Sequence, residues 1–331
     1  MALSRALQRL APAGGGLTIG IDLPLDNDWR HGPGTGDGIP DLRRHAELAT
    51  LADRLGFAAL WVRDVPLFDR VRFGDAGTVF ETFAHLGHLA AITTEAVLGT
   101  AAVVLPLRAG LLTAKAAATV DVLSSGRLVL GVASGDRPVE YPLFGVDFQQ
   151  RGALFRQSVE HLRAAWSRPA PGQGIAVPSL GLDATLEIDV LPKPVGPGVP
   201  LVVAGKAQQS LEWIAGNADG WFNYPRDLDG LTAQLAAWHR LTRDAGTDKP
   251  YLMPLMLDLV ADPVATPEPI FHGLRTGREA LLDHIEELRR RGVRHLSLSL
   301  RHCARPVDEV LHELAETVLP NFHPARAAAQ A

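Results

Sequence analysis

Two glycine-rich turns combine residue types that can hold a phosphate group. The first, GVASGDR at 131–137, offers backbone N–H groups and a serine hydroxyl to an anion. The second, AGKAQQS at 204–210, places the cation Lys206 just before a predicted helix. Backbone donors, helix dipole and ammonium group would then converge on one point, which suits a phosphate monoester. Glycine and serine also populate most turns of this kind, and a solvated lysine explains Lys206 equally well.

A strand predicted at 97–105 contains the run of small residues Gly99, Thr100, Ala101 and Ala102. Side chains of this size leave room for a flat ring to lie against the backbone. A barrel core that needs small side chains to fit their neighbours explains the same run equally well. The sequence alone does not separate these two interpretations.

Polar residues follow several predicted strands and could act on a substrate. After the strand at 57–62, the Asp64 carboxylate could accept a proton or orient a substrate. A structural ion pair between Arg63 and Asp64 explains these residues equally well. Further candidates are supported by their placement alone: Asp22, Trp29, Asn223, Tyr224, Arg301 and His302.

Three other side chains could belong to a site or only to the structure. Tyr141 could reach a flat cofactor or merely close its own loop. His85 and His88 have helical spacing, but no set of carboxylates accompanies them, so we expect structural or surface positions and no metal site.

Short β-rich segments alternate with amphipathic helical segments, a pattern typical of parallel strands covered by helices. About eight such units in a chain of this length predict an α/β fold, a closed (β/α)₈ TIM barrel. Asp41 is expected to cap a helix that Gly56 ends, and Gly292 ends the helix predicted at 278–291. The predicted strands are 17–23, 57–62, 97–105, 127–132, 200–204, 219–222, 251–260 and 294–300.

The chain divides into one large domain with loose ends. Residues 1–16 are expected to form a flexible extension, 17–322 the barrel and 323–331 a tail. Proline and glycine interrupt the alternation at 168–199, which predicts an insertion between the fourth and fifth barrel strands. Long connections are also expected at 24–40, 63–78 and 261–277.

Composition excludes several classes of partner. A formal net charge of −5 without a basic stripe argues against nucleic acid. The single cysteine, Cys303, cannot form an intramolecular disulfide and suits a cytoplasmic protein. No apolar run approaches the roughly 20 residues that span a membrane.

Residues 97–152 and 199–221 resemble luciferase-like flavin monooxygenases. The resemblance rests on the strand ending in AAVVLP, the AxAATxDxLSxGR helix exit, the strand LVLGV, the Gly-Val-Asp-Phe loop and the segment VPLVVAGKAQQSLEWIAGNADGW. It is good across about residues 17 to 225. It implies a cis peptide bond between Ala101 and Ala102, and a flavin phosphate held by the two glycine-rich turns.

The resemblance also implies sets of site residues. The cofactor-binding set is Thr100, Ala101, Ala102, Ser134, Gly135, Tyr141, Ala204, Gly205, Lys206, Ser210 and Trp221; the catalytic candidates are Asp64, Arg63 and His302. Luciferase has arginine in place of Ser134 and a Glu-Ser pair in place of Gly205 and Lys206, which suggests that the cation has changed turns. Asp64 replaces the luciferase histidine, so light emission is not expected.

We therefore expect an oxidoreductase, a two-component monooxygenase that receives reduced FMN from a separate reductase and uses dioxygen on a small organic substrate. The deazaflavin F420 serves close relatives, so F420-dependent hydride transfer is one alternative, and a non-catalytic flavin-binding protein is another. A metal-dependent hydrolase is disfavoured because IDLPLD lacks paired histidines. The resemblance further implies a homodimer.

Overall fold

The computed structural model describes residues 4–25, 42–69, 71–72, 80–224, 227–244 and 246–323. Trp29, one of the candidates at the barrel mouth, and Asp41, the expected cap of the first barrel helix, lie outside these residues. The connections expected at 24–40 and 63–78 are described only in part.

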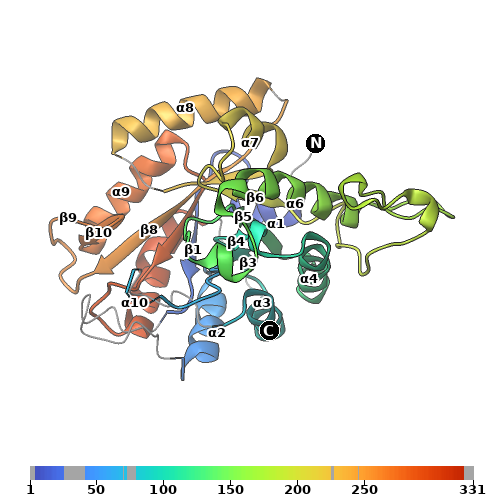
Figure 1. The fold of residues 1–331 in the computed structure, drawn as a ribbon. Coiled ribbons are helices and arrows are strands. Elements are labelled where there is room, and N and C mark those ends of the chain that lie inside the picture. The colour runs from blue at the N-terminus through green and yellow to red at the C-terminus, as the bar shows by residue number, and fades with distance from the viewer. Residues whose placement is uncertain are drawn as a thin grey trace.

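Eight parallel strands form a closed barrel at the centre of the molecule (Figure 1). Each strand pairs with the next in chain order, and the last pairs with both the first and the seventh. The eight predicted strands and the TIM barrel are thereby confirmed. The strands are β1 (Thr18–Asp22), β2 (Ala59–Val62), β3 (Val97–Thr100) continued by β4 (Val103–Val104), β5 (Leu128–Ala133), β6 (Leu201–Ala204), β7 (Gly220–Phe222), β8 (Tyr251–Leu259) and β11 (His295–Ser299).

Helices cover the outside of the barrel because each buries one apolar face against the strands. In α9 (Arg278–Arg291), Leu281, Ile285 and Leu288 face inward, and Gly292 ends the helix with a φ of 112°. The others are α2 (His45–Leu55), α3 (Thr82–Ile92), α4 (Gly110–Leu123), α5 (Glu140–Leu143), α6 (Arg151–Trp166), α7 (Leu211–Asn217), α8 (Leu228–Asp244) and α10 (Val307–Glu313).

Alternate strand residues fill the barrel interior around one large side chain. Trp61 lies within it, and its ring packs edge-on against Phe222 with 5.0 Å between centroids. A Cβ atom on Gly99 would lie 2.3 Å from the Trp61 ring. The interpretation of Gly99 as a small core residue is therefore the one that the structure supports.

The N-terminal segment differs from the predicted flexible extension. Helix α1 (Arg5–Leu10) buries Ala6, Leu7 and Leu10 against the inward-facing strand residues. The Thr18 hydroxyl also donates to the Leu10 carbonyl at 2.6 Å. The prediction of a flexible extension is therefore wrong for residues 4–16. Apolar burial holds this segment in place, where it closes the bottom of the barrel.

The segment 168–199 lies outside the barrel, as predicted, and projects beyond α4 and α6 in Figure 1. Its base is anchored by hydrogen bonds such as that from the Val195 N–H to Asp121 at 2.8 Å. The connection expected at 261–277 instead contains two short strands, β9 (Glu268–Ile270) and β10 (Gly273–Thr276). Strand β10 pairs with the end of β8 and extends the sheet beside the barrel mouth.

The described part of the C-terminal segment is also packed. His323 accepts a hydrogen bond from the Ile19 N–H at 2.7 Å, so the expected tail begins no earlier than the next residue. Among the described residues, none of the helices has the length and apolar character that a membrane crossing requires.

Candidate functional site

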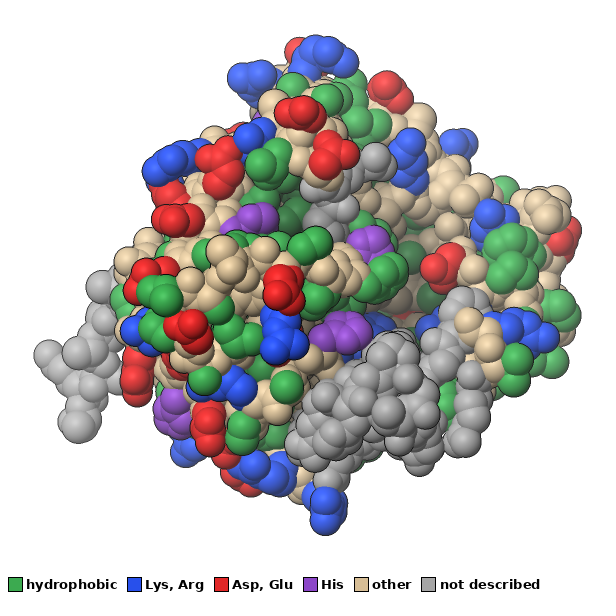
Figure 2. Space-filling model, turned by 90° about the vertical axis from the view of Figure 1, so that its left-hand side faces the viewer, with side chains coloured by type: hydrophobic (Ala, Val, Ile, Leu, Met, Phe, Trp, Pro, Cys, Tyr) green, Lys and Arg blue, Asp and Glu red, His purple; other side chains and the backbone are tan. Residues whose placement is uncertain are grey.

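The carboxyl ends of the barrel strands form the mouth where TIM-barrel enzymes place their sites. Figure 2 shows the face of the molecule toward which β8 runs. Basic, acidic and histidine side chains alternate over the described part of this face and do not form a patch of one sign.

Tyr141 holds the turn after β5 in place through a hydrogen bond to its backbone. The Tyr141 side chain is fully buried, and its hydroxyl donates to the Ser134 carbonyl. Burial raises the pKa of Tyr141 to about 12. A Cβ on Gly135, whose φ is 77°, would lie 2.6 Å from the Tyr141 oxygen, so only glycine fits there. Tyr141 therefore supports the turn, in place of the direct cofactor contact that the sequence predicted.

The turn after β6 presents consecutive backbone donors. Gly205, Ala207 and Gln208 have φ angles of 60°, 46° and 59°. The Gly205 N–H donates to Phe222 at 2.8 Å, but within the described residues nothing accepts from the N–H groups of Lys206, Ala207 or Gln208. Successive unpaired N–H groups in such a turn form a concave site for an anion.

Lys206 adds a positive charge to this turn. Its side chain is exposed and forms no ion pair with any described residue. A Cβ on Gly205 would meet no atom within 4 Å, so the backbone before the lysine also faces open space. Since β5 and β6 are paired neighbours, the two glycine-rich turns lie side by side.

Two residues of the predicted cofactor set are used by the protein instead. Ser210 caps α7 by accepting from the Trp213 N–H at 3.2 Å. The Glu212 carboxylate has a lowered pKa because it accepts from its own backbone N–H and from the Ser210 hydroxyl. Trp221 is buried outside the barrel and donates to the Gly205 carbonyl at 2.6 Å. Ser210 and Trp221 thus shape the turn, because their polar atoms are already engaged.

A cation that the sequence did not suggest lies at the start of α6, near the Tyr141 that supports the β5 turn. Arg151 stacks on Phe148, 3.7 Å from its ring centroid, and its buried Nε has no hydrogen-bond partner. The next residue, Gly152, accepts from the Gln209 side chain at 2.9 Å, which ties the start of α6 to the β6 turn. Only tertiary packing brings Arg151 here, so spacing along the chain could not reveal it.

Strands β3 and β4 are separated by the peptide bond between Ala101 and Ala102, which is cis as predicted. Both alanines are partly exposed at the mouth. Thr100 is fully buried, and its hydroxyl donates to the Gly131 carbonyl at 2.7 Å. The alanines can face a flat ring, whereas Thr100 serves to join β3 to β5 and differs from its predicted cofactor role. Ala204, at the end of β6, is also partly exposed.

The Asp64 carboxylate accepts a full set of hydrogen bonds from within the chain. It accepts from Arg108 Nε at 2.9 Å and Arg108 Nη2 at 2.6 Å, from the Thr82 hydroxyl at 2.9 Å and from the Val104 N–H at 3.0 Å. These four donors fill the acceptor sites of a carboxylate. The structural ion pair is therefore the interpretation that this geometry favours, with Arg108 as the partner, and the catalytic role of Asp64 stays a prediction.

A second polar group lies at the end of β1, the strand that pairs with β2. Asp22 accepts from the Ser297 hydroxyl, and Arg63 and Arg301 lie close enough to favour its ionised form. Burial outweighs these effects and raises the pKa of Asp22. Tyr224 faces Arg63 and Asp22, and its ring lies 5.2 Å from that of His272.

The other mouth candidates contribute less. Asn223 is buried, and its N–H donates to Leu252 at 3.0 Å. His302 is partly exposed in the turn after β11, beside Arg301.

The histidines on the barrel wall have structural contacts. His85 is buried and its Nε2 lies 2.6 Å from Nε2 of His45, while His88 is exposed. Burial lowers the pKa of His45 to about 4 and that of His85 to about 3. In the part of the chain that the structure describes, no three His, Cys, Asp or Glu side chains gather in a metal-binding arrangement.

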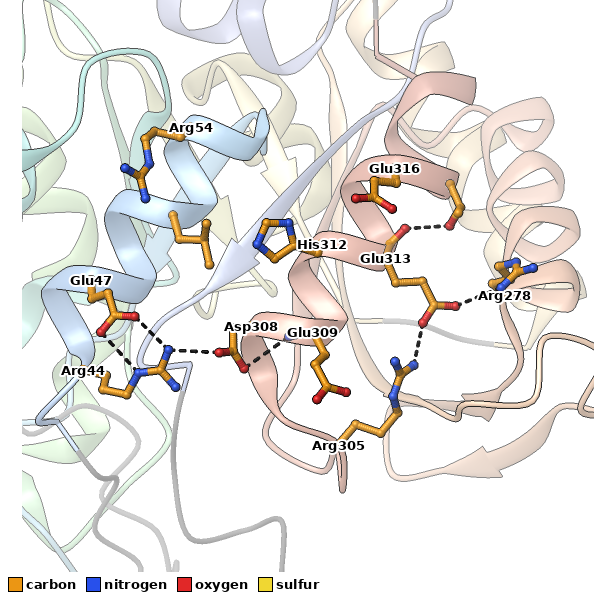
Figure 3. A pocket seen from close by; sticks show the side chains of 12 residues that line it. Arg44, Glu47, Arg54, Arg278, Arg305, Asp308, Glu309, His312, Glu313 and Glu316 are labelled. Carbon is orange, nitrogen blue, oxygen red and sulfur yellow. Dashed lines mark hydrogen bonds and ion pairs between the residues drawn. The ribbon is translucent and has the colours of Figure 1, made fainter.

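A separate groove of about 680 Å³ lies between α2, α9 and α10 (Figure 3). Three of its four arginines form ion pairs: Arg44 with Glu47 at 2.8 Å and with Asp308 at 3.1 Å, and both Arg278 and Arg305 with Glu313. The pair between Arg44 and Asp308 joins the first and last barrel helices, so the groove belongs to the barrel wall.

Comparison with known proteins agrees with this geometry. Residues 25–266 match the luciferase-like monooxygenase family, and the chain belongs to that family. It is 32% identical over 199 residues to the uncharacterized protein Rv0953c of Mycobacterium tuberculosis, covering 56% of this chain and 68% of that protein.

Two solved structures show the same fold at low sequence identity. An F420-dependent secondary alcohol dehydrogenase in complex with an F420–acetone adduct has a TM-score of 0.72 at 17% identity, covering 93% of this chain and 100% of the other. The oxygenating constituent of 3,6-diketocamphane monooxygenase from Pseudomonas putida, in complex with FMN, has a TM-score of 0.68 at 13% identity, covering 93% and 99%.

Proposed function

We propose that this oxidoreductase is a two-component monooxygenase, which binds reduced FMN at the barrel mouth and uses dioxygen on a small organic substrate. The observation that carries the proposal is the β6 turn, where three backbone N–H groups without an acceptor among the described residues adjoin Lys206, a cation that pairs with none of them. A phosphate monoester needs such a set of donors. Family membership supports a flavin or deazaflavin cofactor as the molecule that carries this phosphate.

The residues present fit such a group. Gly135 allows the β5 turn to pack tightly on Tyr141, and Ala101 and Ala102 leave the mouth open beside it. Arg151 supplies a second cation next to both turns. When bound and reduced, the flavin would supply electrons for oxygen activation or hydride transfer.

The chain's own residues would bind and orient the ring. Lys206 and the backbone of the β6 turn would hold the phosphate, with Ser134 and Gly135 beside it. The Asp64–Arg108 pair fixes the Val104 N–H, and so keeps the strand that carries the two alanines in place. We also propose a separate reductase as a partner, since no NADH-binding fingerprint follows a strand. A homodimer stays a prediction that rests on the family resemblance.

F420-dependent hydride transfer is the second candidate, favoured by the similarity to the F420-dependent alcohol dehydrogenase. The same turn would hold its phosphate. Parallel titrations of the purified protein with reduced FMN and with reduced F420 separate the two. Tighter binding of FMN by tenfold or more supports the monooxygenase, and the reverse preference would replace it with hydride transfer.

A further inference from the structure

A polar row faces the interior at the carboxyl ends of β1 and β11. Strand β11 alternates His295, Ser297 and Ser299 with two leucines that point outward, into the apolar core between the strands and the helices. Strand pairing places Thr18 beside His295 and Gly20 beside Ser297, so Asp22 and Ser299 are the next pair in this register. A carboxyl group and two hydroxyls therefore meet at the mouth.

This row is not fully satisfied by the protein. The Ser299 side chain is 1% exposed, and its Oγ has no hydrogen-bond partner. Asp22 accepts one side-chain hydrogen bond, from Ser297. The contrast with Asp64 and its four donors shows that Asp22 retains capacity for another partner.

The charges around the row restrict what that partner can be. Arg63, from the end of β2, and Arg301, after β11, face Asp22, and Tyr224 faces it from the end of β7. The two arginines disfavour a cationic group. A neutral oxygen that accepts hydrogen bonds is compatible with all of these groups.

We propose that Asp22 and Ser299 form the subsite that receives the carbonyl oxygen of the substrate, with Ser297 as a positioning residue for Asp22. The inference rests on the proposed function, because it names the substrate class of that same site. The Ser299 hydroxyl donates to the carbonyl oxygen, and Asp22 does so when it is protonated.

Burial favours the protonated form, since it raises the pKa of Asp22. Carbonyl binding should then weaken as pH rises and Asp22 ionises. Burial also raises the pKa of Tyr224, which faces Asp22, so this dependence is left to the carboxyl group.

The probe is cyclohexanone, with methylenecyclohexane as an analogue of the same shape that lacks the acceptor oxygen. Binding is measured with and without FMN, in the parent protein and in Ser299→Ala and Asp22→Ala. We expect Ser299→Ala to weaken cyclohexanone about twofold to tenfold, which is the range for one neutral hydrogen bond. Asp22→Ala should weaken it at least as much and remove its pH dependence, and methylenecyclohexane should be unaffected.

Thermal stability distinguishes a binding role of Ser299 from a structural one. If Ser299 only stabilised the fold, its replacement would lower the melting temperature. Because the Ser299 hydroxyl is buried without a partner, Ser299→Ala should keep or slightly raise the melting temperature. Ser124→Ala is the matched control: Ser124 is also 1% exposed, but its hydroxyl donates to Asp121 at 3.2 Å. That variant should melt lower and bind cyclohexanone normally.

The carbonyl stretch of ¹³C-labelled cyclohexanone, measured without flavin, should lie at lower frequency in the parent than in Ser299→Ala. Equal ketone affinity in parent and variants, no ketone binding in the parent, or a loss of stability in Ser299→Ala would overturn the inference. Failure of the proposed function is separate, because it would appear as absent flavin binding in the parent whatever the ketone does.

Discussion

The Asp64 carboxylate and the turn after β6 lie on the same barrel mouth, but the protein satisfies their polar groups to different degrees. Asp64 receives four hydrogen bonds from within the chain. The N–H groups of Lys206, Ala207 and Gln208 find no acceptor among the described residues. A saturated polar group stabilises the fold, whereas an unsaturated one is available to a ligand. Mutations on the two sides should therefore affect different properties.

The largest effect is expected where a saturated pair is broken. Arg108→Leu would leave the Asp64 carboxylate buried without its cation, so stability should fall by about 3–5 kcal/mol. Urea unfolding measures the loss. Arg290→Ala is the control, since Arg290 pairs with Glu286 on an exposed surface and its removal should change stability by less than about 1 kcal/mol. Similar losses in both variants would show that the Asp64 pair is no more than a surface contact.

The floor of the barrel is a second saturated region, and pH should reveal it. His295 Nε2 accepts from Trp61 at 2.9 Å, and Nδ1 lies 2.7 Å from the Thr18 hydroxyl, which itself donates to Leu10. The network therefore assigns the single imidazole proton to Nδ1 and leaves no place for a second. Burial lowers the pKa of His295 to about 3.

The unfolded chain binds the second imidazole proton of His295 more readily than the folded chain does. The free energy of unfolding should therefore be highest above about pH 6.5 and decline as pH falls toward 4. The slope from His295 is about 1.4 kcal/mol per pH unit. His45 and His85 have lowered pKa values and add to the decline in the same direction. Unfolding titrations at several pH values should show a shallower slope in His295→Gln than in the parent. An unchanged slope would contradict the assigned proton.

The sequence predicts the barrel well because strand runs and helix-ending glycines are local signals. The φ angles of Gly56 and Gly292, 100° and 112°, fit the predicted helix ends. The partner of Asp64 could not be predicted, since Arg108 lies 44 residues away and reaches it only through the fold.

The polar residues on β11 are visible in the sequence as an alternating pattern, but the pattern does not say which face of the strand they occupy. The segment HLSLS alternates polar and apolar residues, which indicates a strand with one polar face. In this barrel the polar face is the interior one, and it carries the buried hydroxyl of Ser299. Periodicity defines two faces, but only the closed barrel decides which of them faces the site.

The Lys206→Ala variant tests the proposed phosphate site in the turn after β6 most directly, with FMN and riboflavin compared as ligands. A charge-assisted contact to the phosphate contributes about 1.5–3 kcal/mol, so FMN should bind roughly tenfold to a hundredfold more weakly. Riboflavin lacks the phosphate, so its low affinity should hardly change, and the unfolding free energy should stay within about 0.5 kcal/mol. Ser134→Ala should show the same pattern with a smaller loss, about 0.5–1.5 kcal/mol. Equal losses for FMN and riboflavin, or no loss for either, would contradict a phosphate site in the turn after β6.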